Sequence, residues 1–289
     1  MSTTLEQLLD KVSQLVDRIE AVLPQPLGAP DWSQAVAWRY RKRASGHGVL
    51  EPVRHVAAMS LNDLQEIDDQ KEKMQRNIEQ FVQGRPANNV LLTGARGTGK
   101  SSLIKACLNH FAPQGLRLIE VDKDDLTDLP DIIDVVAGRD EKFMVYCDDL
   151  SFEDGEPGYK ALKSILDGSV AAATPNVLVC ATSNRRHLLP EYMAENLSYT
   201  HTADGEVHPG EVVEEKISLS ERFGLWISFY PFSQDEYLTI AGQWLGALGA
   251  TPAQIEEARP AALLWALERG SRSGRVAYQF ARDHMGRLA

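Results

Sequence analysis

The sequence has few cysteines, a deficit of positive charge and no long apolar run, and each shortage excludes a class of protein. Cys107, Cys147 and Cys180 lie far apart and form no CxxC pair, which argues against a disulfide scaffold or a zinc site and suits a reducing compartment. Lys and Arg number 30 against 41 Asp and Glu, so the net charge of −11 gives no general affinity for nucleic acid. Without a membrane-length apolar run or a signal-peptide core, we expect a cytoplasmic protein that does not contact a membrane.

One glycine-rich stretch carries the strongest functional pattern. The apolar residues 90–92 lead into GARGTGKS, which fits the P-loop pattern G-x-x-x-x-G-K-[ST], and a helical pattern follows at 101–110. Glycines let backbone N–H groups face phosphates, the lysine adds a cation, and the helix N-terminus favours the same anion. The sequence therefore predicts a nucleoside triphosphate site, with ATP as the cofactor, formed by Gly94, Ala95, Arg96, Gly97, Thr98, Gly99, Lys100, Ser101 and Ser102.

Strand and helix patterns alternate around this stretch. The 289 residues, 43% of them hydrophobic, suffice for one large domain and a smaller one. Buried-strand patterns occur at 90–92, 116–121, 143–147, 176–181 and 225–230, and helical patterns at 61–82, 101–110, 122–134 and 157–170. This alternation predicts an α/β fold, a three-layer αβα sandwich of the P-loop NTPase type with a parallel five-stranded sheet. The segment 61–82 is placed to cover an adenine ring.

Helical patterns occupy both ends of the chain. A capping box, Ser233 to Glu236, opens a helix to about residue 248, and further helices are expected from 251, with a possible kink at Pro260, and over 275–288. An apolar stripe at 3–23 predicts an N-terminal helix that packs on the protein's own body or on a second copy. We expect three regions: 1–50, an N-terminal helix and basic linker; 51–232, the nucleotide-binding domain; and 233–289, a helical lid. A loop is expected over 195–211.

A basic cluster interrupts the acidic composition just before the predicted core. Two interpretations stay open. The cluster contacts phosphate or nucleic acid, with the aromatics stacking on bases, or it forms a solvated or intersubunit face against acidic side chains. The cluster consists of Arg39, Arg41, Lys42 and Arg43, interleaved with Trp38 and Tyr40.

Two carboxylates follow the strand predicted at 143–147. A buried parallel strand delivers such groups to the C-terminal edge of its sheet, where the P-loop also lies. Asp148 and Ser101 are the expected ligands of Mg²⁺, Asp148 acting through water, and Asp149 is the candidate to polarise an attacking water. Lys100 would compensate the charge of the phosphates.

These motifs, in this order and spacing, resemble those of AAA+ ATPases. More specifically, residues 38–280 resemble a bacterial family of uncharacterised predicted AAA+ ATPases known as a domain of unknown function. The matching runs are GARGTGKSSLIKA, YCDDLSFE, ATSNRRHL, LSERFGLWISF and GSRSGRVAYQF. The resemblance covers most of the chain and implies an AAA+ core with a C-terminal helical lid, but it lends no physiological task.

The resemblance also implies roles for single residues. Asn184 would lie between the acids and the γ-phosphate as sensor 1, with Thr182 as the alternative. Arg222 would be an arginine finger that reaches the γ-phosphate of a neighbouring subunit. From the lid, Arg275 would be sensor 2, with Arg272 as the competing candidate.

The sequence departs from the AAA+ pattern at two points. The second acid is usually Glu, whereas Asp149 is one methylene shorter, so Glu153 is an alternative for positioning water. Polypeptide-threading AAA+ machines usually carry an aromatic pore loop after the second strand, where residues 121–126 are acidic without an aromatic. A threading unfoldase is therefore disfavoured.

Three functions remain open from the sequence. The first is an ATPase that works as a homo-oligomer, ring or helical, with a hexamer as one option, and remodels or loads a macromolecular partner. The second is an ATP-dependent assembly switch or scaffold with little turnover. The third, ranked last, is a small-molecule kinase. The acidic charge and the lack of any nucleic-acid-binding motif favour a protein partner over nucleic acid.

Overall fold

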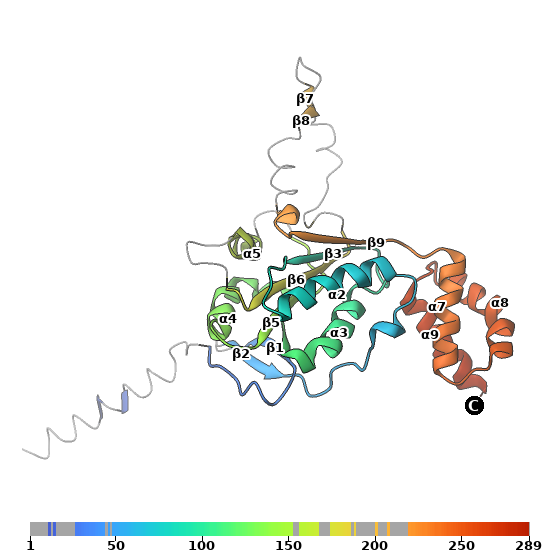
Figure 1. Cartoon of the computed structure of the whole chain (residues 1–289), viewed down its shortest axis with the longest axis horizontal. Helices are drawn as coiled ribbons and strands as arrows, with labels where there is room; N and C mark the ends of the chain where they lie inside the picture. The colour runs from blue at the N-terminus through green and yellow to red at the C-terminus, as the bar shows by residue number, and fades with distance from the viewer. Residues whose placement is uncertain are drawn as a thin grey trace, which may run out of the picture.

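The structure is a computed structural model of the 289-residue chain, and it confirms the α/β architecture (Figure 1). A mostly parallel sheet lies between two helical layers, and the C-terminal helices form a bundle at one end of it. The described residues are 11–12, 14–15, 27–43, 46, 48–152, 156–167, 174–185, 188, 200–201, 207–208 and 219–288.

The main sheet has the spatial order β2-β1-β4-β5-β6-β3-β9. Every neighbouring pair is parallel except β1 and β2, which are antiparallel. The strand that leads into the P-loop, β3, lies between β6 and β9, and its core residues are fully buried, as expected for a strand covered on both faces. The strands are β1 (Ala37–Lys42), β2 (Gly48–Pro52), β3 (Val90–Gly94), β4 (Leu116–Glu120), β5 (Lys142–Cys147), β6 (Val177–Ser183) and β9 (Leu225–Phe229).

The prediction of a five-stranded sheet is wrong, because the described sheet has seven strands. The five predicted strands are present, and β1 and β2 extend the sheet beyond β4. β1 contains all of the basic cluster except Arg43, so this segment is a strand and not a linker. A strand exposes alternate side chains, and in β1 the aromatic residues alternate with the cations.

The aromatic residues of the basic cluster do not stack on a ligand. Trp38 and Tyr40 are 0% and 4% exposed, so the stacking role considered for them is wrong. Three of the cations pair with acids of the same chain: Arg39 with Glu120 at 2.7 Å, Lys42 with Asp128 at 2.8 Å and Arg43 with Glu51 at 3.8 Å. The acidic side chains that neutralise these cations therefore belong to the same chain and not to a neighbouring subunit.

Helices cover both faces of the sheet. On one face α2 (Asp68–Val82) and α3 (Lys100–Phe111) share an apolar core with the strands, and on the other α4 (Leu129–Val136) and α5 (Pro157–Asp167) do so. The segment 61–82, predicted to be helical, consists of a 3-10 turn, η1 (Leu61–Asp63), and then α2. Residues 168–170 of the helix predicted at 157–170 lie outside the described residues.

The helix predicted at 122–134 is divided into two parts. A 3-10 helix, η3 (Lys123–Asp128), is capped by Asp122, whose carboxylate accepts a hydrogen bond from the Asp124 amide. Pro130 then stands in the first turn of α4, where its missing N–H has no partner to lose. The aspartates of this segment therefore cap and start short helices.

The three predicted C-terminal helices are present. They are α7 (Gln234–Ala247), α8 (Pro252–Glu268) and α9 (Gly274–Leu288). The capping box at Ser233 and Glu236 is formed, and α8 continues through Pro260 as one helix. Their buried side chains belong to the same apolar core as α2 and α3, so the bundle is packed against the sheet domain.

Some predictions fall outside the described residues. These are most of the N-terminal helix, most of the loop expected at 195–211, and Glu153. A few residues of these two segments are described. Lys11, Val12, Gln14 and Leu15 are helical, and β7 (Thr200–His201) pairs with β8 (Val207–His208).

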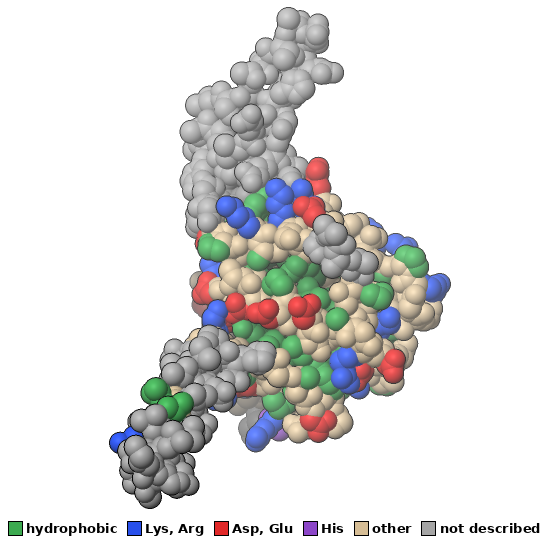
Figure 2. All heavy atoms as spheres, turned by 90° about the vertical axis from the view of Figure 1, so that its left-hand side faces the viewer, with side chains coloured by type: hydrophobic (Ala, Val, Ile, Leu, Met, Phe, Trp, Pro, Cys, Tyr) green, Lys and Arg blue, Asp and Glu red, His purple; other side chains and the backbone are tan. Residues whose placement is uncertain are grey.

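Surface charge, the helices and the cysteines add three observations. On the face drawn in Figure 2, Lys and Arg side chains are interspersed with Asp and Glu rather than gathered into one basic surface. None of the described helices is both long and apolar enough to span a bilayer. All three cysteines are buried free thiols, as expected for strand and helix interiors.

Candidate functional site

The P-loop connects β3 to α3, as the sequence predicts. Gly94, Gly97 and Gly99 adopt positive φ angles of 133°, 75° and 103°, which side chains with a Cβ rarely adopt. A Cβ on Gly94 would lie 1.9 Å from the Phe229 carbonyl oxygen, and one on Gly97 would lie 2.8 Å from the Ser273 side chain. Glycine is therefore required both by the turn and by the close approach of β9 and the lid.

Lys100 is folded back onto the loop. Its ammonium donates to the carbonyl oxygens of Gly94 at 2.7 Å and Ala95 at 2.8 Å, and to Asn184 Oδ1 at 3.1 Å. Burial lowers the pKa of Lys100, while the Asp148 and Asp149 carboxylates act in the opposite direction. The cation is thus held beside both acids by acceptors that a phosphate could replace.

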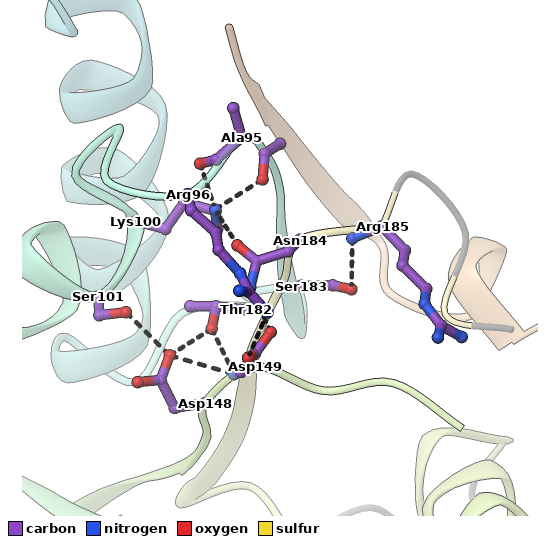
Figure 3. A network of polar contacts seen from close by, with 11 residues as sticks. Ala95, Arg96, Lys100, Ser101, Asp148, Asp149, Thr182, Ser183, Asn184 and Arg185 are labelled. Atoms are coloured by element: carbon purple, nitrogen blue, oxygen red, sulfur yellow. Dashed lines mark hydrogen bonds and ion pairs between the residues drawn. The ribbon is translucent and has the colours of Figure 1, made fainter. Parts of the chain in front are cut away.

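Asp148 is the centre of a hydroxyl cluster at the end of β5 (Figure 3). Its Oδ1 accepts hydrogen bonds from Ser101 Oγ at 2.8 Å, Thr182 Oγ1 at 2.5 Å and the Asp149 amide at 3.1 Å. Burial alone would raise the pKa of Asp148, but the nearby hydroxyls of Thr182, Tyr146 and Ser101 outweigh it and lower that pKa. Asp148 is consequently a carboxylate at neutral pH.

Asp149 occupies a strained backbone position next to Asp148. Its φ is 50°, which is uncommon for a residue other than glycine, and strain of this kind concentrates at functional sites. The turn is fixed by hydrogen bonds to Thr182 from the Asp149 amide at 2.9 Å and from the Leu150 amide at 2.7 Å. The Asp149 carboxylate accepts from Asn184 and lies 3.9 Å from Arg96.

The lid touches the P-loop directly. The Gly274 amide, at the start of α9, donates to the Gly97 carbonyl oxygen at 2.8 Å. This contact brings Arg275 to the cavity wall, whereas Arg272 is not among the described residues that line it. Of the two lid arginines considered for sensor 2, the structure places Arg275 at the site.

A cavity of about 800 Å³ opens between the P-loop, the segment before α2 and the lid. Its P-loop end is formed by residues 96–102 with Asp148, Asp149, Thr182 and Asn184. Its apolar end is formed by Met59, Leu64, Ile67, Ile240, Trp244 and Tyr278.

The apolar end was not predicted residue by residue from the sequence. The segment 61–82 was expected to cover a base, and Leu64 and Ile67 belong to it. Trp244 and Tyr278 come from α7 and α9, with their rings 4.8 Å apart in an edge-on contact. Nothing in the sequence distinguishes these two aromatics from ordinary lid core. Lys105, which also lines the cavity, was missed as well.

Arg222 lies away from this cavity. It is not among the described residues that line it, and its guanidinium pairs with Asp167 at the end of α5. The Arg222 side chain is 25% exposed. The predicted role of Arg222 thus concerns another copy of the chain and not its own site.

The oxygen groups at the P-loop end suit Mg²⁺. No group of three or more His, Cys, Asp or Glu side chains arranged for a metal occurs in the part of the chain that the structure describes. Magnesium in nucleotide sites, however, usually takes only one or two protein oxygens and completes its shell with phosphates and water. The Ser101 hydroxyl and the ionised Asp148, 2.8 Å apart, fit that requirement.

Comparisons with known proteins agree on the fold. Two point mutants of RuvB from Thermotoga maritima match with a TM-score of 0.52, at 14% and 15% identity, over 78% of this chain and 64% of the RuvB chain. A chain of the HORMA:CdnC:Trip13 complex of E. coli MS115-1 matches with a TM-score of 0.50, at 14% identity, over 77% of this chain and 90% of that one. The chain thus has the P-loop fold of AAA+ ATPases and spans under two thirds of RuvB.

The family comparison is more specific. None of the curated proteins matches the chain. A family model described as "Protein of unknown function (DUF815)" matches residues 33–288, nearly the whole of the part of the chain that folds around the sheet and the lid. The chain therefore belongs to the DUF815 family.

Proposed function

We propose that this protein is an ATPase that binds ATP with Mg²⁺ and hydrolyses it to ADP and phosphate. One observation carries the proposal: Ser101 Oγ donates to Asp148 Oδ1 at 2.8 Å, at the P-loop end of the cavity. This contact joins the P-loop hydroxyl to a carboxylate that follows β5, a buried strand separated from β3 by β6, beside a lysine. P-loop NTPases use these three groups together to bind the phosphates and Mg²⁺.

Each residue of the P-loop end has a proposed task. Residues 94–102 hold the phosphates through their amides, and Lys100 leaves the Gly94 and Ala95 carbonyls to pair with them. Ser101 and Asp148 hold Mg²⁺, which when bound neutralises phosphate charge. Asp149, oriented by Asn184, accepts a hydrogen bond from the attacking water.

The apolar end and the lid complete nucleotide binding. The edge-on pair Trp244 and Tyr278, which lines the cavity together with Ile67, offers apolar and aromatic surface for a base. Arg275 reaches the cavity from the first turn of α9, so it is the lid cation proposed to meet the γ-phosphate. We retain the lid boundary at residue 233 and propose 51–232 as the nucleotide-binding region. The strands β1 and β2 extend the sheet of this region.

We further propose that the active form is a homo-oligomer in which Arg222 acts on the neighbouring copy. Its distance from its own cavity and its partial exposure support this role, because a finger must reach outward. Pairing with Asp167 would hold it until a neighbour docks. The structural neighbour from the HORMA:CdnC:Trip13 complex was solved with protein partners, which supports a protein partner for this chain too. A cytoplasmic location stays a prediction.

Steady-state ATPase assays across protein concentration test the proposal. We expect specific activity to rise with concentration, and Arg222→Ala to lower turnover by about 1,000-fold while ATP binding stays close to that of wild type. Asp167→Ala is the matched control, because it removes this ion pair and keeps the arginine. Equal specific activity at all concentrations, or an Arg222→Ala enzyme as fast as wild type, would refute catalysis in trans.

The geometry of Asp149 favours a second candidate function. Its carboxylate is shorter than the usual Glu, is bound by Asn184, and lies 3.9 Å from Arg96. An acid held in this way is a poor acceptor for a water proton, which suits an ATP-dependent assembly switch with little turnover. Such a switch would assemble with ATP and show almost no phosphate release.

A further inference from the structure

The hydroxyl of Tyr146 is a buried polar group beside the site that the proposed function leaves without a role. Tyr146 lies on β5 in the apolar core that includes α3, and Asp148 bonds to Ser101 of α3, so both side chains lie on the same face of the sheet. The residue is 3% exposed, and its hydroxyl makes no hydrogen bond with any described residue. A buried hydroxyl without a partner is unfavourable and requires an explanation.

This hydroxyl lies against the Asp148 cluster. The pKa of Tyr146 is raised, first by burial and then by the charge of the Asp148 carboxylate, while the hydroxyls of Ser101 and Thr182 act in the opposite direction. The phenol is therefore close to all three groups without the geometry of a hydrogen bond to any of them. Tyr146 is a fourth polar group around Asp148, in addition to the three that bond to it.

Three donors compete for a single oxygen of Asp148, and the Tyr146 hydroxyl is not among them. Ser101, Thr182 and the Asp149 amide all donate to the same oxygen, Oδ1. A carboxylate oxygen has two lone pairs, so three donors already exceed its usual capacity. Ser101 thus occupies a place on Oδ1 that Tyr146 could otherwise take.

We propose that Tyr146 is a positioning residue of the magnesium site, which exchanges hydrogen-bond partners with Ser101. This inference rests on the proposed function. When Ser101 turns from Asp148 to the metal, one place on the carboxylate is vacated, and the Tyr146 O–H donates to it. The exchange keeps Asp148 fixed while Ser101 is withdrawn. It also gives the state with bound nucleotide and Mg²⁺ a hydrogen bond that the nucleotide-free state lacks. The exchange therefore strengthens metal binding.

Tyr146→Phe tests the exchange, because it keeps the ring and removes only the hydroxyl. A fluorescent ATP analogue is titrated in EDTA and then with increasing Mg²⁺. We expect nucleotide affinity in EDTA to equal that of wild type. The Mg²⁺ concentration that gives half of the gain in nucleotide affinity should rise about tenfold, which corresponds to the loss of one hydrogen bond to a charged group. The melting temperature without nucleotide is expected to stay the same or rise, since no hydrogen bond is lost.

Tyr237→Phe is the matched control. Tyr237 is also fully buried, but it lies in the lid and its hydroxyl donates to the Ala262 carbonyl oxygen at 3.1 Å. This substitution removes a hydrogen bond that exists without nucleotide. We expect it to lower the melting temperature and to leave the Mg²⁺ dependence unchanged, the reverse of the Tyr146→Phe result.

The possible outcomes separate this inference from the proposed function. If wild type shows Mg²⁺-dependent nucleotide binding and Tyr146→Phe shows the same dependence, the exchange is refuted and the proposed function stands. A loss of melting temperature in Tyr146→Phe as large as in Tyr237→Phe would also refute it, because the hydroxyl would already be bonded. If wild type shows no Mg²⁺-dependent binding at all, both proposals are refuted.

Discussion

The two ends of the cavity are built differently. The P-loop end consists of polar groups that bond to one another, such as Lys100 with Asn184 and Ser101 with Asp148. Most of them lie in one short segment or directly after a strand. The apolar end is assembled from the segment before α2, α7 and α9, and its side chains meet through packing alone. Directional contacts need particular residues at fixed spacing, whereas apolar contact needs only area and shape.

This comparison predicts that the two ends recognise different parts of ATP. Inorganic triphosphate carries the phosphates without the base, so it separates the two contributions. Lys100→Ala has the largest expected effect, because it removes the cation beside both acids. We expect turnover to fall by at least about 100-fold and the affinity for inorganic triphosphate to fall with that for ATP. ATPase rates and calorimetric titrations with both ligands measure this.

Lys105→Ala is the control for Lys100→Ala. Lys105 lies on the same helix and also lines the cavity, but its side chain is exposed. An exposed cation is screened by water and salt, so we expect its removal to change both quantities by less than about tenfold. If the two alanine variants behave alike, the P-loop end recognises phosphates by overall charge and not by the folded loop.

Trp244→Ala is expected to have a smaller and selective effect. It removes aromatic surface from the apolar end, so we expect ATP affinity to fall about tenfold, in line with the burial of one aromatic side chain against a base. The affinity for inorganic triphosphate should stay within about twofold of wild type. Tyr278→Phe keeps the neighbouring ring and should leave both affinities unchanged. A parallel loss for both ligands would mean that the lid, and not a base site, had been disturbed.

The smallest expected effect concerns β1, on the far side of the sheet from the P-loop strand. As at the apolar end, the contacts here join segments that are distant in sequence and follow no motif. Asp128 accepts from Tyr40 at 2.8 Å and pairs with Lys42, which joins η3 to β1. Burial alone would raise the pKa of Asp128, but the hydrogen bonds from Lys42 and Tyr40 outweigh it and hold that pKa below its ordinary 3.8. A carboxyl group whose pKa is lowered in the fold stabilises the fold fully at pH values above its ordinary pKa. This stabilisation is lost as the pH falls through the lowered pKa.

We therefore expect Asp128→Asn to reduce the free energy of unfolding by about 1 kcal/mol at pH 7, with the difference from wild type shrinking below about pH 4. Denaturant titrations at several pH values measure this difference. Glu51→Gln is the control, because Glu51 forms an exposed pair with Arg43 at 3.8 Å and should show almost no effect. A constant difference at all pH values would show that charge is not the cause.

Much of the architecture could be predicted because its patterns are local. The five buried strands show as apolar runs, and the capping box at Ser233 marks the start of α7. β1 was missed because its alternation of Trp38, Arg39 and Tyr40 resembles a basic ligand-binding cluster. Whether these cations are available to a ligand depends on Glu120 and Asp128, which lie about 80 residues away in sequence and neutralise Arg39 and Lys42.

The sequence by itself determined the P-loop and the acids after β5, because a glycine turn and the end of a buried strand are set by residues adjacent in the chain. It also indicated the lid arginines, but only the tertiary structure separated Arg275 from Arg272, through the contact of Gly274 with Gly97. The same holds for Trp244 and Tyr278 at the apolar end, and for Tyr146 beside Asp148. Which side chains share a cavity depends on how distant segments pack, and that information is carried by no single stretch of the chain.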